Sequence, residues 1–285
     1  MPLHLQTPLI ESGAMSSREG QSVWLKMEAM QPPGSFKIRG IGFACEEYVR
    51  RGATRFISSS GGNAGIAAAY AGRRLGVPVL VVVPETTTAR AKELISRENA
   101  QLIVHGASFQ EANAMAQSLV TGTDAFIHPF DDPLLWEGHA TMIDEVAAAG
   151  VKPDAVVLSV GGGGLMCGVI EGLRRNGWND VPVVAVETLG ADSFAQSIAA
   201  HERVELPGIS SIATSLGARK VAEQAFALAQ NHTVQSVVVS DADAVRACLL
   251  FMDDHRVVVE PACGASLAVA YDASNSLAQY KNVLV

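Results

Sequence analysis

The chain alternates short apolar stretches with longer segments in which apolar residues recur at helical spacing. The clearest apolar stretch is VLVVV at residues 79–83, which is typical of a strand buried on both faces of a sheet. Strands that alternate with helices of this length indicate parallel βαβ units. We predict strands at residues 56–57, 79–83, 101–104, 155–160, 181–186 and 235–240, and helices at residues 64–75, 89–98, 108–119, 165–176 and 241–254, the last with Asp241 as its N-cap.

Two segments interrupt this alternation, residues 31–40 and the polar, proline-containing residues 128–138. We interpret them as the points at which the chain passes between two lobes. This interpretation predicts a small domain of residues 39–131 and a large domain made of residues 1–38 and 132–285. With 285 residues, the chain is long enough for both. The predicted fold class is α/β, with a mostly parallel twisted sheet flanked by helices in each lobe.

Composition and charge exclude several classes of protein. The chain is 48% hydrophobic and has a formal net charge of −8 without a basic block, so we expect no nucleic-acid partner. Its most apolar run, residues 77–84, is far shorter than the roughly 18 residues that a membrane span needs. The N-terminus does not read as a signal peptide, and the four cysteines show neither CxxC spacing nor a disulfide framework. We therefore expect a soluble cytoplasmic protein without a membrane partner.

Two glycine-rich loops each follow a predicted strand and precede a predicted helix. In GGGG at residues 161–164, backbone amides and the positive end of the helix dipole favour a phosphate. An ordinary tight turn would need fewer glycines, which favours the phosphate site. A dinucleotide-binding turn is still a possible alternative, because Glu187 ends the next strand and could bind a ribose. SSSGGNAG at residues 58–65 offers hydroxyls, an amide and backbone donors to a carboxylate or another anion, unless Ser60 or Asn63 only caps the helix. No GK[ST] follows, which excludes a Walker A loop.

A lysine in GSFKIRG is the third candidate. Lys37 lies between Phe36 and Ile38, and apolar neighbours favour the amine form that a Schiff base requires. Taken alone, a loop lysine is more simply a surface residue. The sequence around Lys37 therefore becomes informative only together with the other motifs.

The order of the motifs carries a resemblance to a known family. GSFKIRG (34–40), SSGGNAG (59–65) and SVGGGGL (159–165) resemble, in this order, the pyridoxal-phosphate (PLP) enzymes of the tryptophan-synthase-β type, fold type II. HPFDDPLLWEGHA (128–140), VETLGADSF (186–194) and VEPACGAS (259–266) are similar to the L-serine/L-threonine dehydratase branch. The resemblance spans nearly the whole chain. It implies two lobes with the cofactor in the cleft between them, and usually a homodimer.

The resemblance also implies roles for individual residues. It makes Lys37 the catalytic residue that forms the Schiff base, with Phe36 packed on the cofactor ring and Asn63 bonded to its phenolic oxygen. It implies a phosphate site at Gly161, Gly162, Gly163, Gly164 and Leu165, and a substrate-carboxylate site at Ser60, Gly61, Gly62, Asn63 and Ala64. A monovalent cation, K⁺ or Na⁺, is implied at Glu187, Ala191, Ser193, Leu216 and Ala218.

The implied reaction is an ammonia-lyase reaction. Lys37 removes the α-proton, the cofactor acts as the electron sink, and the β-hydroxyl leaves. Serine then gives pyruvate and threonine gives 2-oxobutanoate, each with ammonia. In serine racemases of this fold, a serine before the Gly-Asn pair supplies a second acid/base group. Gly61 stands there in this chain, which disfavours racemisation, although Ser60 is adjacent. We also expect Gly61 to leave a roomier substrate loop.

Two other functions stay open on sequence alone. One is β-replacement of the cysteine synthase type, although those enzymes usually carry a different segment after the lysine than KIRG. The other is a weakly active homologue that holds PLP with little turnover. We interpret His139 as a helix residue satisfied by its neighbours. Residues 282–285 resemble the start of an apolar strand, which in this branch leads to a turn facing the pyridine nitrogen. We therefore expect either a truncated form or a pyridine nitrogen that another group contacts.

Overall fold

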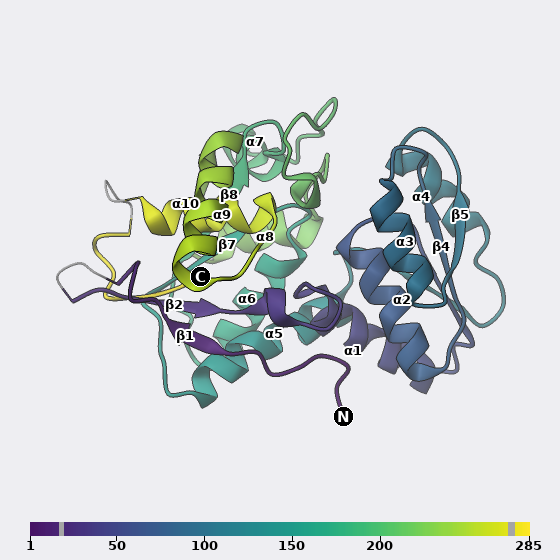
Figure 1. The fold of residues 1–285 in the computed structure, drawn as a ribbon, viewed down its shortest axis with the longest axis horizontal. Coiled ribbons are helices and arrows are strands. Elements are labelled where there is room, and N and C mark those ends of the chain that lie inside the picture. The colour runs from purple at the N-terminus through teal and green to yellow at the C-terminus, as the bar shows by residue number, and fades with distance from the viewer. Residues whose placement is uncertain (17–19, 273–276) are drawn as a thin grey trace. The chain divides into compact units, whose positions relative to one another are not determined.

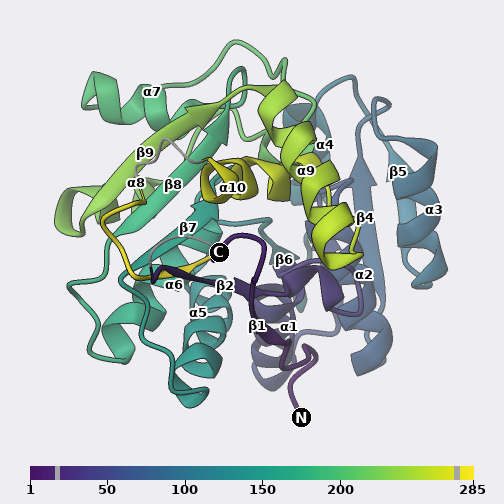
Figure 2. The same cartoon turned by 60° about the vertical axis from the view of Figure 1, so that its left-hand side comes forward.

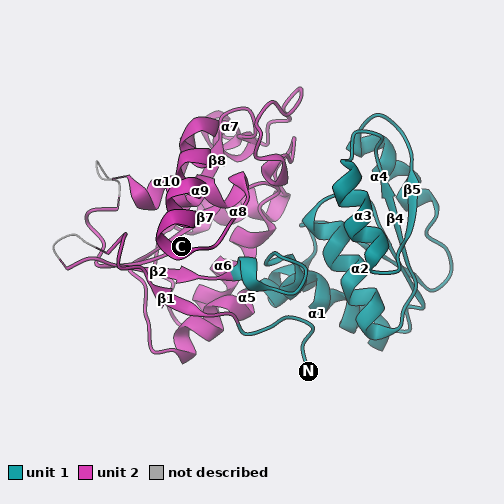
Figure 3. Cartoon of the chain, in the orientation of Figure 1, with its two compact units in different colours: residues 1–6, 28–139 teal, residues 7–27, 140–285 magenta. Residues whose placement is uncertain are grey.

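The computed structural model describes residues 1–16, 20–272 and 277–285, and the chain forms two compact units. Unit 1 contains Met1–Gln6 and Glu28–His139, and unit 2 contains Thr7–Met27 and Ala140–Val285 (Figure 3). Residues 1–6, 28–38 and 132–139, which the sequence assigned to the large domain, lie in unit 1. The reason is that helix α1 (Lys37–Arg50) packs on helix α2 (Asn63–Leu75) of unit 1.

Unit 1 is built on a four-stranded parallel sheet with the order β5-β4-β3-β6. All five residues of β4 are buried, as expected for a strand covered on both faces. The alanines of α2 let it approach the neighbouring elements closely, and they form much of this core. The elements of unit 1 are η1 (Glu28–Met30), α1, β3 (Arg55–Ser58), α2, β4 (Val79–Val83), α3 (Ala89–Arg97), β5 (Gln101–Val104), α4 (Phe109–Ser118), β6 (Asp124–Ile127) and the start of α5 (Pro133–Ala148).

Unit 2 is built on a six-stranded sheet with the order β1-β2-β10-β7-β8-β9, in which only the β1–β2 pair is antiparallel. Helix α10 packs on β7 and β8, and α9 packs on α10 (Figures 1 and 2). Its elements are β1 (Leu9–Glu11), β2 (Ser22–Lys26), β7 (Ala155–Ser159), α6 (Gly164–Arg175), β8 (Val183–Thr188), α7 (Ser193–Ala200), η2 (Thr214–Leu216), α8 (Glu223–Asn231), β9 (Val234–Val239), α9 (Asp241–His255), α10 (Pro261–Tyr271) and β10 (Asn282–Leu284).

The alternation of strands and helices predicted from the sequence is confirmed. The predicted strand at residues 282–285 is also confirmed, because β10 lies between β2 and β7 in the sheet. The predicted N-cap of α9 is wrong: Ser240 caps the helix by accepting from the Asp243 amide. Asp241 instead accepts hydrogen bonds from Ser211 Oγ and the Ile212 amide. Among the described residues, no helix has the length and hydropathy of a membrane span.

Candidate active site

Lys37 is the first residue of α1, directly after Phe36. It is half-buried, and its Nζ donates a 2.6 Å hydrogen bond to the Pro129 carbonyl. The same Nζ lies 5.2 Å from the centroid of the Phe36 ring. The first turn of α1 contains no acidic residue, and the helix dipole places its positive end there, which disfavours a further positive charge. Lys37 is therefore not the solvated surface lysine of the simpler interpretation.

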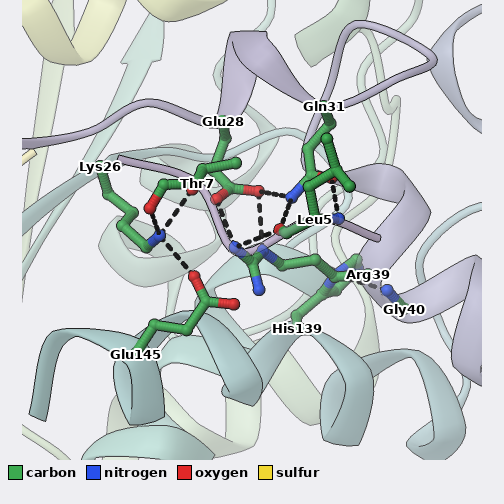
Figure 4. Close-up of polar contacts among 9 residues, drawn as sticks. All are labelled: Leu5, Thr7, Lys26, Glu28, Gln31, Arg39, Gly40, His139 and Glu145. Carbon is green, nitrogen blue, oxygen red and sulfur yellow. Dashed lines mark hydrogen bonds and ion pairs between the residues drawn. The ribbon is translucent and has the colours of Figure 1, made fainter. Parts of the chain in front are cut away.

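The arginine of KIRG anchors the segment around Lys37. Arg39 is fully buried and donates from Nε and Nη2 to the two carboxylate oxygens of Glu28, at 2.8 and 2.7 Å. Gln31 accepts from the Leu5 amide and donates to the Leu5 carbonyl, both at 2.9 Å (Figure 4). Because a bidentate guanidinium–carboxylate pair fixes geometry as well as charge, the start of α1 is tied to η1 and to the N-terminal residues of unit 1.

The SSSGGNAG motif forms the turn between β3 and α2. The N-cap residue is Gly62, not Ser60 or Asn63 as the capping alternative required, and as a glycine it has no side chain that could cap the helix. Ser60 Oγ instead accepts from the Gly62 amide at 3.3 Å, and Asn63 is the first helical residue. The first turn of α2 therefore starts at a glycine N-cap, and its backbone amides point out of a helix N-terminus, as in an anion-binding site.

Gly61 faces a threonine. A Cβ on Gly61 would lie 2.5 Å from Thr87 Oγ1 and 2.7 Å from Thr87 Cγ2. The expectation that Gly61 leaves a roomier loop is therefore wrong for this side of the residue, because the Thr87 side chain fills the space. Thr87 lies in the turn after β4, and nothing in the local sequence marks it as a neighbour of the glycine.

The four-glycine motif forms the turn between β7 and α6 in unit 2. Gly163, the N-cap residue of α6, has a φ of +89°, and a Cβ there would clash with Ala225. The Gly162 carbonyl accepts a 3.0 Å hydrogen bond from the Ala222 amide, which fixes the loop. As a glycine, Gly163 has no side chain that could cap α6. This loop presents backbone amides at a helix N-terminus, the geometry that binds phosphate.

The contacts of Glu187 argue against a dinucleotide-binding site at the four-glycine turn. It is fully buried at the end of β8, and its two oxygens accept from the Phe194 and Ala195 amides at 2.9 and 2.7 Å. A dinucleotide site needs an acidic side chain that faces a ribose, whereas this carboxylate is occupied by the start of α7. Burial raises the pKa of Glu187 to about 8.

The residues implied for a cation lie in two segments of unit 2. Glu187, Ala191 and Ser193 share the β8–α7 turn, where Ser193 Oγ is buried without a hydrogen-bond partner among the described residues. Leu216 ends η2 and its carbonyl accepts from the Ala218 amide at 2.7 Å. The described residues contain no group of three or more His, Cys, Asp or Glu side chains that would hold a metal ion.

Comparison with known proteins shows the family of this chain. The sequence matches the family described as "Pyridoxal-phosphate dependent enzyme" over residues 1–285. It is 50% identical over 273 residues to the L-serine dehydratase/L-threonine deaminase of Homo sapiens, covering 95% of this chain and 83% of the human protein. The crystal structure of a fungal L-serine ammonia-lyase from Rhizomucor miehei superimposes with a TM-score of 0.92 at 38% identity, covering 100% of this chain and 93% of that one. Maize serine racemase gives a TM-score of 0.88 at 26% identity, with 99% and 87% covered. The chain therefore belongs to the pyridoxal-phosphate-dependent enzymes, and its fold is that of fold type II.

Proposed function

We propose that this protein is a PLP-dependent L-serine/L-threonine ammonia-lyase, which converts serine to pyruvate, or threonine to 2-oxobutanoate, with release of ammonia. The observation that carries the proposal is the half-buried amine of Lys37 at the start of α1, in a chain whose α2 and α6 also begin at glycine-rich turns with a glycine as N-cap residue. The relatives named L-serine dehydratase and L-serine ammonia-lyase support the substrate class.

The residues of each unit fit parts of the cofactor. In unit 2, the amides of residues 161–165 would hold the phosphate, because they lie at the N-terminus of α6, where the positive φ of Gly163 forms the turn. In unit 1, Lys37 would attach the cofactor through its amine, Phe36 would pack on the ring, and Asn63 would bond the phenolic oxygen. When bound, PLP withdraws electrons from the substrate Cα.

The protein's own groups then have distinct tasks. Lys37 Nζ accepts the α-proton, which requires the neutral amine, and the first turn of α1 has no carboxylate that would stabilise the ammonium form. The turn at residues 60–64 binds the substrate carboxylate through the first-turn amides of α2. Gly61 carries no proton donor, so we expect elimination rather than racemisation from this loop.

Keto-acid release from a panel of amino acids tests the proposal. Wild-type protein should form pyruvate from L-serine without added sulfide, and Lys37→Ala should lose both turnover and the visible absorbance of bound PLP. Lys152→Ala, an exposed lysine in unit 2, is the matched control and should behave as wild type. Sulfide-dependent serine consumption without pyruvate would indicate β-replacement, and bound PLP without keto acid would indicate a weakly active homologue. Either result would overturn the proposal.

The same assay in K⁺, Na⁺ and tetramethylammonium buffers addresses the cation. We propose that K⁺ or Na⁺ binds at Glu187, Ala191 and Ser193 with carbonyl oxygens of Leu216 and Ala218. The buried, unpartnered Ser193 Oγ supports this assignment. Equal activity and equal PLP affinity in all three buffers would contradict it.

We also propose that the protein is a cytoplasmic homodimer. The four cysteines Cys45, Cys167, Cys248 and Cys263 are all free thiols, as suits a reducing compartment. The exposed side of α9 carries the apolar residues Val245, Leu249 and Met252, which suit contact with a second copy of the chain.

A further inference from the structure

A buried histidine lies against the first turn of α1. His139, in α5, is fully buried, and its Nδ1 accepts a 3.2 Å hydrogen bond from the Gly40 amide (Figure 4). Its ring also meets the Phe36 ring edge-on, with centroids 5.0 Å apart. One side chain thus contacts the residue before Lys37 and the residue three positions after it.

The protonation state of His139 follows from these contacts. A backbone amide only donates, so Nδ1 must be unprotonated and the neutral ring carries its hydrogen on Nε2. Burial is the main cause that holds the pKa of His139 well below its usual value, and the positive charges of Lys37, Arg39 and His4 act in the same direction. Nε2 is buried without a hydrogen-bond partner among the described residues. The sequence-based view that neighbours satisfy His139 is therefore correct for one ring nitrogen only.

The backbones of α1 and α5 touch at this point. A Cβ on Gly40 would lie 2.6 Å from both His139 Cε1 and the Leu135 carbonyl oxygen. A Cβ on Gly138 would clash with the Arg39 carbonyl and would lie 2.7 Å from Gly40 Cα. Because both helices use a glycine at the crossing, the imidazole cannot shift without moving the turn that carries Lys37.

A polar ring nitrogen without a partner is unfavourable in a packed interior, where an apolar side chain of similar size would avoid the cost. From the contacts with Gly40 and Phe36, we infer that His139 is a positioning residue that sets the orientation of the Lys37 amine and the Phe36 ring. It transfers no proton in this assignment. The inference rests on the role proposed above for Lys37.

Two substitutions of His139 distinguish its role as hydrogen-bond acceptor from the packing of its ring. His139→Asn places Oδ1 near the position of Nδ1 and keeps an acceptor for the Gly40 amide. His139→Leu keeps a similar volume without an acceptor. We expect His139→Leu to lower kcat for serine about tenfold with KM changed less than about twofold, and His139→Asn to recover to within about threefold of wild type.

A second readout does not depend on turnover. In PLP-free protein, the rate at which trinitrobenzenesulfonate modifies Lys37, followed by peptide mass spectrometry, should change in His139→Leu and return toward wild type in His139→Asn. The absorbance of bound PLP and its dissociation constant should follow the same order. If Lys37 labelling and PLP binding stay unchanged while only Tm falls, His139 is a packing residue and the inference is wrong.

Controls keep the outcomes distinct. Val146→Ala, a buried position further along α5 in unit 2, should lower Tm without changing Lys37 labelling. If His139→Leu does not fold, His139→Gln replaces it, because Gln carries its amide one position further out and so loses the acceptor near Nδ1. If wild type forms no keto acid but labelling and PLP binding respond as expected, the proposed function fails and the positioning role stands.

Discussion

At the scale of single residues, the position of Thr87 beside Gly61 gives a direct test of the proposed substrate-binding turn at residues 60–64. The structure predicts that Gly61→Ala forces its new methyl group against Thr87 Oγ1 and Cγ2. Overpacking of this kind costs about 1–3 kcal/mol, so we expect a lower free energy of unfolding and a higher KM for serine. Urea denaturation and initial-rate kinetics measure the two effects.

Thr87→Ala supplies the matched control for that prediction. The double variant Gly61→Ala/Thr87→Ala should regain most of the stability that Gly61→Ala loses, since the second change removes both clashing atoms. Strictly additive effects of the two substitutions would show that Thr87 does not occupy the space beside residue 61.

Thr87 is an example of a residue whose contact in the site could not be predicted from the sequence. Lys37 and the glycines of residues 161–164 are found from motifs because their chemistry restricts which residue types fit. Thr87 and His139 gain their contacts from segments distant in the chain, 26 and 99 positions from Gly61 and Gly40 respectively, by the difference of their numbers. No local pattern records such contacts, so only the tertiary structure reveals them.

At the scale of elements, an ion pair joins the first residues of β3 and β6. Arg55 and Asp124 are register partners, and Arg55 Nε and Nη2 donate to the Asp124 carboxylate at 2.9 and 2.5 Å. The hydrogen bond from Arg55 is the main cause that lowers the pKa of Asp124 to about 2. Because the pKa of Asp124 in the folded state lies below its usual value of 3.8, the pair stabilises the fold above that pH and loses its contribution as pH falls through about 2.

This ion pair predicts a pH-dependent cost for Asp124→Asn. At pH 7 the variant should be only slightly less stable than wild type, because solvent screens a pair whose arginine is partly exposed. Urea denaturation should show that the difference from wild type shrinks as pH falls below 3.8 toward about 2. Glu202→Gln removes an exposed carboxylate as the control and should show a smaller change. A difference that grows on acidification would contradict the ion-pair explanation.

The elements also show why some of the fold escaped prediction. Strands such as β4 and β5 were predicted with their observed bounds because a short β-branched run between turns has few alternatives. Helices α1 and α5 were missed because glycine and proline near their starts read as interruptions. Pro133 in fact occupies the first position of α5, where its missing N–H costs nothing, and Gly40 and Gly138 serve the close crossing of the two helices. The short strand β1 has too few residues to show a period.

For the whole molecule, the outer side of α9 in unit 2 is the surface that suits a second copy of the chain. Val245, Leu249 and Met252 recur at helical spacing and are 37%, 54% and 37% exposed, whereas Ala247 and Phe251 are buried. Helix α10 lies between α9 and the sheet (Figure 2). An apolar stripe of this kind on the surface of a protein indicates an interface. Leu249→Asp should therefore shift the protein toward monomer in analytical ultracentrifugation, whereas Phe109→Asp, an exposed apolar position in unit 1, should not.

Charges along α9 make this interface prediction more specific. In a two-fold symmetric pair of antiparallel helices, an axis between Leu249 and Leu250 brings Arg246 opposite Asp253 of the second copy, and Asp243 opposite Arg256 of the second copy. Reversing one charge, in Arg246→Asp or in Asp253→Arg, should weaken the dimer because like charges then face each other. The double reversal Arg246→Asp/Asp253→Arg should recover part of the lost dimer affinity, since opposite charges again face each other between the copies while the pair of Arg246 with Asp243 within the helix is lost. If the double variant dissociates as readily as the single ones, or if wild type sediments as a monomer, the two copies do not meet along α9.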